Sequence, residues 1–186
     1  MKTIPTALVL ASLMALAGCG QESHEAASNQ SATSGSAERQ QAPTLPDGFF
    51  LSAAPSEVIS VSQARGSAET GQDIAFTGYI GGRVEPFTEG RAVFLLADSA
   101  KAPQCTEGCP APHDACCVPR DVIAANSATV QVVDADGQPL KLDLNGLNGV
   151  VPGAEVTVVG TVREANDSLL IVDASGIVAD QGAAAN

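Results

Sequence analysis

The residues best suited to chemistry lie in one short segment, from Cys105 to Arg120, which reads CTEGCPAPHDACCVPR. The segment holds four of the five cysteines and one of the two histidines of the chain. Cysteine thiols can form disulfides, bind soft metal ions or act as nucleophiles. Which of these applies depends on the compartment in which the protein works and on the elements that position the segment.

Two interpretations of these cysteines compete, and the one we favour is covalent. Cys105, Cys109, Cys116 and Cys117 would form two disulfides, because an even number of cysteines in an exported chain is typical of such a framework. Cys116 and Cys117 are neighbours, so a bond between them would be strained. The pairings that remain cross from the first two cysteines to the last two, and the sequence leaves open which of them forms.

The second interpretation is a metal site. The pattern C-x3-C-x3-H-x2-C-C offers four thiolates and the imidazole of His113 to one zinc or monovalent copper ion. The spacing is not that of a standard zinc finger, and the thiols would have to be reduced. We expect no cofactor in the covalent interpretation and zinc or copper in this one.

Catalytic chemistry has less support from the sequence. Cys109 and His113 lie four residues apart, but a thiol–histidine nucleophile needs a spatial pair and an orienting group. The sequence contains no Cys-x-x-Cys, HExxH or GxSxG motif. We therefore predict no catalytic residues, and a thiol–disulfide enzyme ranks third, after a binding module and a metal-handling protein.

The N-terminus indicates where the cysteines work. Lys2 gives a short positive start, and residues 4–17 form an apolar run broken only by small or hydroxyl residues and Pro5. This pattern predicts a secretory signal peptide over residues 1–18. The run of about 14 residues is shorter than the roughly 20 that a membrane-spanning helix needs.

The end of this run, Leu16-Ala17-Gly18-Cys19, resembles the lipobox of bacterial lipoprotein precursors. The resemblance implies that Cys19 receives a diacylglycerol and becomes the acylated first residue of the mature chain. Gly20 stands where an aspartate would mark retention in the inner membrane. The expected location in a Gram-negative cell is therefore the outer membrane, facing the periplasm. Two or more acyl chains would make Cys19 a lasting anchor.

Composition divides the rest of the chain into a tether and one domain. Residues 19–46 contain almost no large apolar side chain, which predicts a flexible tether because little surface can be buried to offset the entropy of ordering. We expect His24 in this tether to be solvated. The chain beyond it, about 140 residues, suffices for one domain with a modest core, and residues 181–186 should form a disordered tail.

The charge balance argues against nucleic acid as a partner. The chain has 9 Lys and Arg residues against 21 Asp and Glu residues, no tryptophan and one tyrosine. Loss of Lys2 with the signal peptide leaves 8 basic residues and a side-chain charge of about −13. Phosphate backbones are bound mainly by Lys and Arg, with aromatic side chains stacking on the bases.

Hydrophobic periodicity predicts a mostly β domain after a lead-in over residues 47–72. Ser60 and Gln63 have the spacing of a capping box, which predicts a short helix ending at Gly71. Gly81-Gly82 should mark a sharp bend, and Asp136-Gly137 a tight hairpin. Alternation or apolar runs predict strands at 73–80, 92–97, 130–134, 140–144, 156–162 and 169–172, with a final edge segment at 177–178.

The motifs TGYIGG and FLLADSA, with residues 152–162 and 169–172, resemble an OB-fold over roughly residues 70–180. The resemblance implies an all-β, small barrel of about five to six strands over residues 73–180, with a long cysteine-rich loop at 99–127. The chain departs from nucleic-acid-binding members because basic residues are sparse and no aromatic pair marks the binding strands. It is more similar to uncharacterised extracytoplasmic OB-fold lipoproteins.

Together these observations predict a membrane-anchored extracytoplasmic lipoprotein that acts as a binding or structural module and not as an enzyme. Its partners would be the membrane, through the lipid anchor, and an unidentified protein or small ligand. The alternative is a metal-handling lipoprotein that uses the cysteine cluster for copper or zinc.

Overall fold

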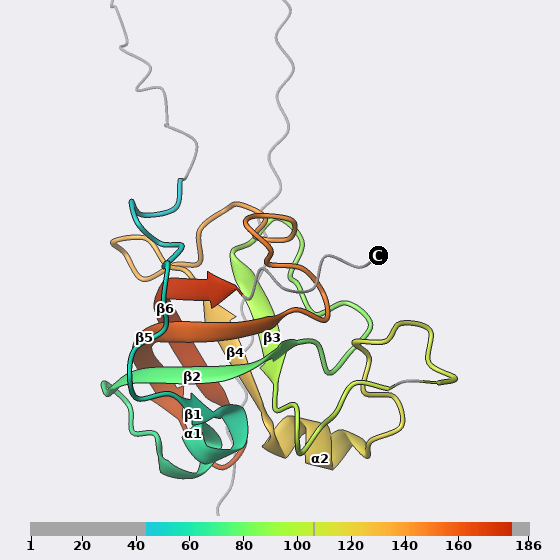
Figure 1. Cartoon of the computed structure of the whole chain (residues 1–186). Helices are drawn as coiled ribbons and strands as arrows, with labels where there is room; N and C mark the ends of the chain where they lie inside the picture. Colours follow the sequence, from blue (N-terminus) through green and yellow to red (C-terminus); the bar gives the residue numbers. More distant parts are fainter. Residues whose placement is uncertain (1–43, 106, 180–186) are drawn as a thin grey trace, which may run out of the picture. The chain divides into compact units, whose positions relative to one another are not determined.

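The computed structural model describes residues 44–105 and 107–179. Cys19, His24, the signal peptide, nearly all of the tether and the tail at 181–186 lie outside the described residues. None of the helices described is long and apolar enough to cross a bilayer. The elements in chain order are β1 (Ile59–Ser60), α1 (Val61–Ser67), β2 (Asp73–Ile80), β3 (Val93–Ala97), α2 (Arg120–Ala125), β4 (Ser127–Gln131), β5 (Glu155–Ala165) and β6 (Leu170–Ala179) (Figure 1).

Five of the strands close into a barrel that mixes parallel and antiparallel pairs. β2 pairs with β3, β3 with β4, β4 in parallel with β6, and β6 with β5, which returns to β2. β1 adds to β2 in parallel as an extra strand that the sequence did not predict. The pairing confirms the predicted small barrel of the OB-like kind.

The barrel interior is filled by the apolar residues that alternate along its strands. Phe76, Phe94 and Val158 are among the side chains that the barrel encloses almost completely. The lead-in also contributes, because Phe49 is only 2% exposed and the N–H of Leu51 donates to the carbonyl of Ile177 at 2.8 Å. The segment before β1 is therefore part of the packed domain.

The predicted capping box is present, but the helix it starts is shorter than expected. The Ser60 hydroxyl accepts from the N–H of Gln63, and the Gln63 side chain accepts from the N–H of Ser60. Helix α1 ends at Ser67 because Ala68 is already extended. Gly71 instead serves the turn into β2, where its N–H donates to the carbonyl of Val162 at 2.7 Å.

The predicted hairpin is only partly right. The chain does turn at Asp136-Gly137, where the N–H of Gly137 donates to the carbonyl of Asp134 at 3.0 Å. The predicted strand at 140–144 does not form, although Leu140 and Leu144 are buried as its alternation requires. Pro139 forms an isolated bridge with Val133, flanked by hydrogen bonds from the N–H of Asp134 to the carbonyl of Gln138 and from the N–H of Leu140 to the carbonyl of Val132, and the pairing does not continue beyond Leu140.

Two further predictions at the end of the chain and in the loop are corrected. Residues 169–172 and 177–178 belong to one continuous strand, β6, which bulges at Ser175 opposite the Val159–Gly160 step. The segment expected to be entirely loop, 99–127, contains helix α2. The prolines that forbid a longer helix end at Pro119, and the six residues after it are free of proline and glycine.

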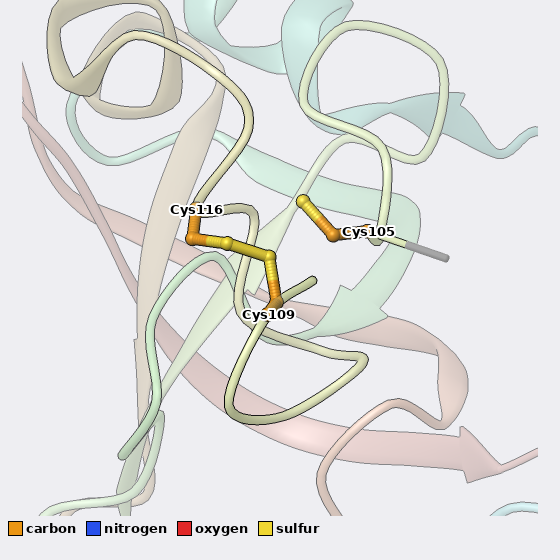
Figure 2. Close-up of side chains that lie close together, drawn as sticks. All are labelled: Cys105, Cys109 and Cys116. Carbon is orange, nitrogen blue, oxygen red and sulfur yellow. A yellow bond between two sulfur atoms is a disulfide. The ribbon is translucent and has the colours of Figure 1, made fainter. Parts of the chain in front are cut away.

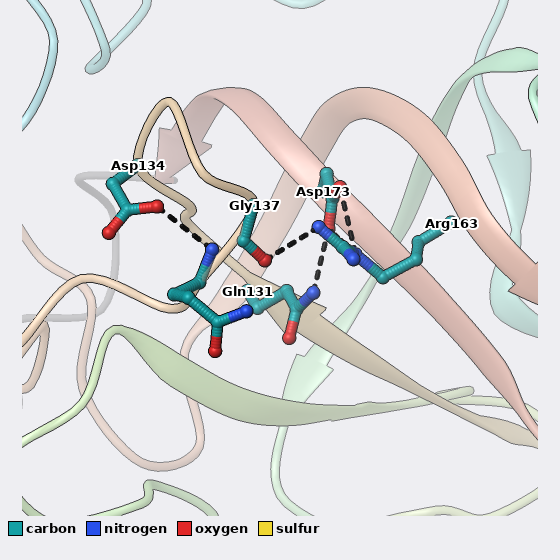
Figure 3. A network of polar contacts seen from close by, with 6 residues as sticks. Gln131, Asp134, Gly137, Arg163 and Asp173 are labelled. Carbon is teal, nitrogen blue, oxygen red and sulfur yellow. Dashed lines mark hydrogen bonds and ion pairs between the residues drawn. The ribbon is translucent and has the colours of Figure 1, made fainter.

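A polar network fixes the turn after β4 against the outside of the barrel (Figure 3). Arg163 on β5 pairs with Asp173 on β6 at 2.9 Å, and its Nη2 donates to the carbonyl of Gly137 at 2.8 Å. The amide of Gln131 on β4 donates to the same carboxylate at 2.8 Å. Hydrogen bonding to Asp173 raises the pKa of Arg163. Three strands and the turn are thereby joined on the solvent side.

Candidate functional site

The cysteine-rich loop lies against the barrel instead of projecting from it. Tyr79 belongs to the outer face of β2, yet it is fully buried in a small second cluster with Ala97 and Ala102, against which Ile123 packs. Its hydroxyl donates to the carbonyl of Ala102 at 2.7 Å. Burial, with the nearby carboxylates, raises the pKa of Tyr79 to about 12. The phenol therefore stays protonated as a donor at physiological pH.

Hydrogen bonds near the start and in the middle of the loop add to this contact. The Gln104 side chain donates to the carbonyl of Gly153 at 3.1 Å, and the Ser99 hydroxyl donates to Glu155. The N–H of Gly82 donates to the carbonyl of His113 at 2.8 Å. The loop thus has its own points of attachment, in addition to any bond between its cysteines.

The predicted bend at Gly81-Gly82 makes this close approach possible. Gly82 adopts a φ of +87°, which favours glycine. A Cβ on Gly81 would lie 2.2 Å from the ring of Tyr79 and 2.5 Å from the carbonyl oxygen of His113. Only a residue without a side chain fits between the barrel and the loop at this point.

Asp98 anchors the start of the loop. It is 2% exposed, and its carboxylate accepts from the N–H of Ser62 at 2.8 Å, of Ala100 at 3.0 Å and of Lys101 at 2.9 Å. Burial alone would raise the pKa of Asp98, but these hydrogen bonds outweigh burial and lower it to about 2. The ionised carboxylate therefore links helix α1 to the loop.

We predict that Asp98→Asn destabilises the domain by about 2 kcal/mol at pH 7, because the amide loses the charge that these donors stabilise. Since the folded pKa lies below the ordinary value of 3.8, the contribution of the carboxylate is present above pH 4 and is lost as the pH falls toward 2. Urea unfolding at pH 7 and pH 2.5 measures the difference between wild type and variant. If the free energies of unfolding of wild type and Asp98→Asn differed by the same amount at both pH values, the prediction would be contradicted. Asp136→Asn, at an exposed position, is the control.

The four cysteines of the loop are joined in two nested pairs. Cys105 is bonded to Cys117 and Cys109 to Cys116, with Cα–Cα distances of 6.3 and 6.1 Å that suit disulfides. Both bonds cross from the first two cysteines to the last two, and the structure supplies the pairing that the sequence left open. Cys105 is nearly buried, at 4% exposed, whereas Cys116 and Cys117 are exposed.

The sulfur atoms of the two pairs lie close together. Those of Cys105, Cys109 and Cys116 are all within 4.8 Å of one another (Figure 2). Among the described residues, His113 is not part of this group. Its Nε2 instead lies 2.8 Å from the carbonyl oxygen of Val84. The structure thus brings three of the proposed metal ligands together and gives the imidazole a different neighbour.

A cavity of about 810 Å³ opens between the loop and the barrel. Its floor includes Leu95 on β3 and Thr129 on β4, which are direct cross-strand partners. Its walls come from four segments: residues 82–85 after β2, the cysteine-rich loop at 114–118, helix α2, and residues 168–170 at the start of β6. In OB-folds the corresponding strands and loops bind ligands.

The lining of the cavity combines an apolar surface with a few polar groups. Leu95, Ile123 and Leu170 are apolar, whereas Arg83 and Arg120 bring two guanidinium groups and Glu85 and Asp114 bring two carboxylates. Within residues 44–105 and 107–179, neither arginine has a carboxylate within salt-bridge distance. The sequence pointed to the loop through its unusual length, but nothing in it singled out these arginines or the strand residues beneath them.

Arg65 holds two walls of the cavity in place. From helix α1 its guanidinium donates to the carbonyl of Ala125 at the end of α2, and to those of Asn166 and Asp167 in the turn between β5 and β6. The three distances are 3.4, 3.3 and 3.0 Å. Helix α2 and the turn are thereby fixed relative to each other.

Comparison with known proteins provides structural likenesses alone. No protein-family model matches the chain, and no curated protein matches it. Among solved structures, the hypothetical protein ygiW from E. coli is 17% identical, over 69% of this chain and 96% of that one, with a TM-score of 0.36. The telomere capping protein Ten1 from Saccharomyces pombe is 13% identical, over 70% and 86%, with a TM-score of 0.35. The chain matched in the S. pombe Stn1-ten1 complex is 14% identical, over 72% of this chain and 83% of that one, with a TM-score of 0.34. The assignment of the barrel depends on the strand pairing described above and not on these likenesses.

Proposed function

We propose that the protein is a lipid-anchored extracytoplasmic binding module whose barrel takes up a small ligand, or a short segment of a partner protein, in the cavity beside the cysteine-rich loop. The cavity is the observation that carries this proposal. Its volume lies in the range of small-molecule sites, and it combines an apolar floor with a few polar groups.

The composition of the cavity fits neither nucleic acid nor the chemistry of an enzyme. No aromatic side chain lines it on which a base could stack, and the chain carries a formal charge of −12. Among the described residues, no nucleophile and base are joined by a hydrogen bond in the cavity, as a catalytic pair requires. Binding without reaction is the function that this lining supports best.

An apolar fluorescent anion, anilinonaphthalene sulfonate, tests whether the cavity accepts a ligand. The apolar floor should bind its rings, and Arg83 or Arg120 its sulfonate. We predict that Ala124→Trp, which places a large ring on the lining from helix α2, weakens binding at least about tenfold, the equivalent of 1.4 kcal/mol. Fluorescence titration of the full chain in detergent measures the affinity.

Two controls accompany this titration. Leu147→Ser changes a side chain that is 40% exposed and outside the cavity, so its affinity for the probe should equal that of wild type. Labelled single-stranded DNA at physiological salt should not bind. Equal probe affinity in Ala124→Trp and wild type would refute the cavity as the site, and micromolar affinity for DNA would refute the exclusion of nucleic acid.

A metal-handling function is the second candidate, and the convergence of three sulfur atoms within 4.8 Å favours it. Reduction of both disulfides would leave thiolates of Cys105, Cys109 and Cys116 at a spacing that one zinc or monovalent copper ion could bridge. His113 would have to leave Val84 to become a further ligand. We retain disulfides as the first candidate because both bonds are accommodated without movement of the backbone.

Intact mass separates these two candidates. We predict that protein purified from the cell envelope is about 4 Da lighter than its fully reduced form, because each disulfide removes two hydrogens. Alkylation without reductant should then label none of the four cysteines of the loop. Free thiols with one equivalent of zinc or copper, lost in His113→Ala, would instead establish the metal site.

A further inference from the structure

We propose that the two disulfides form an exchange relay, in which an external dithiol reduces one pair and the resulting thiolate rearranges the other through Cys105. The proposal rests on the disulfides inferred above and goes beyond ligand binding. Its partner class is a dithiol, either a small molecule or a protein with two neighbouring thiols. The observation behind it is that the sulfur of Cys105 lies within 4.8 Å of both Cys109 and Cys116 (Figure 2).

The two pairs differ in their accessibility to such a partner. Cys116 is exposed and lines the cavity, and Cys109 is partly exposed. In the other pair Cys117 is also exposed, but Cys105 is only 4% exposed. Disulfide exchange depends on access to the sulfur that is attacked. The Cys109–Cys116 bond, in which both cysteines are at least partly exposed, is therefore the preferred entry point, and the sulfur of Cys105 is reached most easily from inside the loop.

The first stage transfers two electrons from the dithiol. Its thiolate attacks the sulfur of Cys116, a mixed disulfide forms, and Cys109 leaves as a thiolate. The second thiol of the partner then attacks the mixed disulfide, so that Cys116 is released and the partner departs as its own disulfide. Two protons accompany the two electrons. The partner is oxidised and the Cys109–Cys116 bond is reduced.

The second stage is an internal exchange without net oxidation or reduction. The thiolate of Cys109 or Cys116 attacks the sulfur of Cys105, a new bond to Cys105 forms, and the bond to Cys117 breaks. Cys117 leaves as a thiolate at an exposed position and takes a proton from water. The N–H of Cys117 donates to the sulfur of Cys105 at 3.1 Å. During the exchange, negative charge is shared among the attacking sulfur, the sulfur of Cys105 and the sulfur of Cys117. The N–H of Cys117 is already in place to stabilise this charge.

Wild-type protein tests the relay without any substitution. The full chain is treated with one molar equivalent of dithiothreitol, quenched with acid, alkylated and mapped by mass spectrometry of its peptides. We expect molecules with two free thiols to include a Cys105–Cys109 or a Cys105–Cys116 bond, in a proportion that does not change on tenfold dilution. Detection of the two original bonds alone, in every molecule that is not fully reduced, would overturn the relay.

The rate of reduction gives a second test. Once the Cys109–Cys116 bond has been reduced, an internal thiolate at an effective concentration in the millimolar range should open the Cys105–Cys117 bond about tenfold faster than external dithiol at about 0.1 mM does. The double variant Cys109→Ala, Cys116→Ala should lose this factor, with circular dichroism confirming that it folds. Equal rates in wild type and variant would overturn the proposal. If the intact mass of the untreated protein lacked the 4 Da deficit, the disulfides themselves would be absent.

Discussion

Replacing Cys19 with Ser is expected to remove the lipid anchor, so that the protein either leaves the membrane fraction or accumulates as the uncleaved precursor. The hydroxyl of serine does not accept the diacylglycerol that the lipobox resemblance implies for the thiol, so either the precursor remains uncleaved or an unacylated chain is released. Each buried CH₂ of an acyl chain contributes about 0.8 kcal/mol to membrane binding. Loss of all the acyl chains therefore removes the attachment of a processed chain. Fractionation of cells into soluble and membrane pools, with the mass of the mature chain, measures the effect.

The cysteines of the loop provide the matched control for this substitution. Cys116→Ser also removes one thiol, but from the loop, and should leave the protein in the membrane fraction. An inhibitor of lipoprotein signal peptidase should make the wild-type protein accumulate as its precursor. A Cys19→Ser chain that is processed and fractionates as wild type does would show that Cys19 carries no lipid.

Replacing Gly81 with Ala is expected to destabilise the domain by about 3 kcal/mol or more, a value that overpacking against backbone can reach. The added methyl group would overlap both the ring of Tyr79 and the carbonyl oxygen of His113. Neither can yield easily, because Tyr79 is fully buried and His113 belongs to the segment held by the N–H of Gly82. The loop must lift from the barrel, or the end of β2 must move.

Chemical denaturation of both proteins, followed by circular dichroism, measures this loss. Gly66→Ala is the matched control, since Gly66 lies exposed in helix α1 with nothing within 4 Å of its added Cβ. Alanine there should stabilise the helix by roughly 0.5 to 1 kcal/mol. If Gly81→Ala were as stable as wild type, the close packing of the loop on Tyr79 would be disproved. Faster alkylation of the loop cysteines after partial reduction would add evidence that the loop has lifted.

The strands of the barrel could largely be predicted because their signals are local. Alternation along 73–80 and 156–162 places apolar side chains on one face with a period of two, and any sheet that buries this face preserves the pattern. The capping box at Ser60 and Gln63 is likewise a contact between residues three apart. Such features depend on neighbours in the sequence, so one sequence suffices to find them.

Failures of prediction arose where distant residues decide the outcome. Leu140 and Leu144 alternate as in a strand, but no partner strand continues beyond Leu140, so no ladder forms along residues 140–144. β1 is only two residues long and exists because β2 lies beside it. Helix α2 buries none of its residues completely, so it carries no periodic signal that would distinguish it from the surrounding loop.

For the candidate site, the residues that could react are evident from the sequence, whereas their arrangement depends on the folded chain. Four cysteines and a histidine within one short segment were evident without coordinates. The nested pairing, the separation of His113 from the sulfurs and the cavity beneath Cys116 all depend on how the loop folds over Tyr79 and β3. The contacts of the loop with Tyr79 and Val84 join residues 23 and 29 positions apart, and no local pattern encodes their distances.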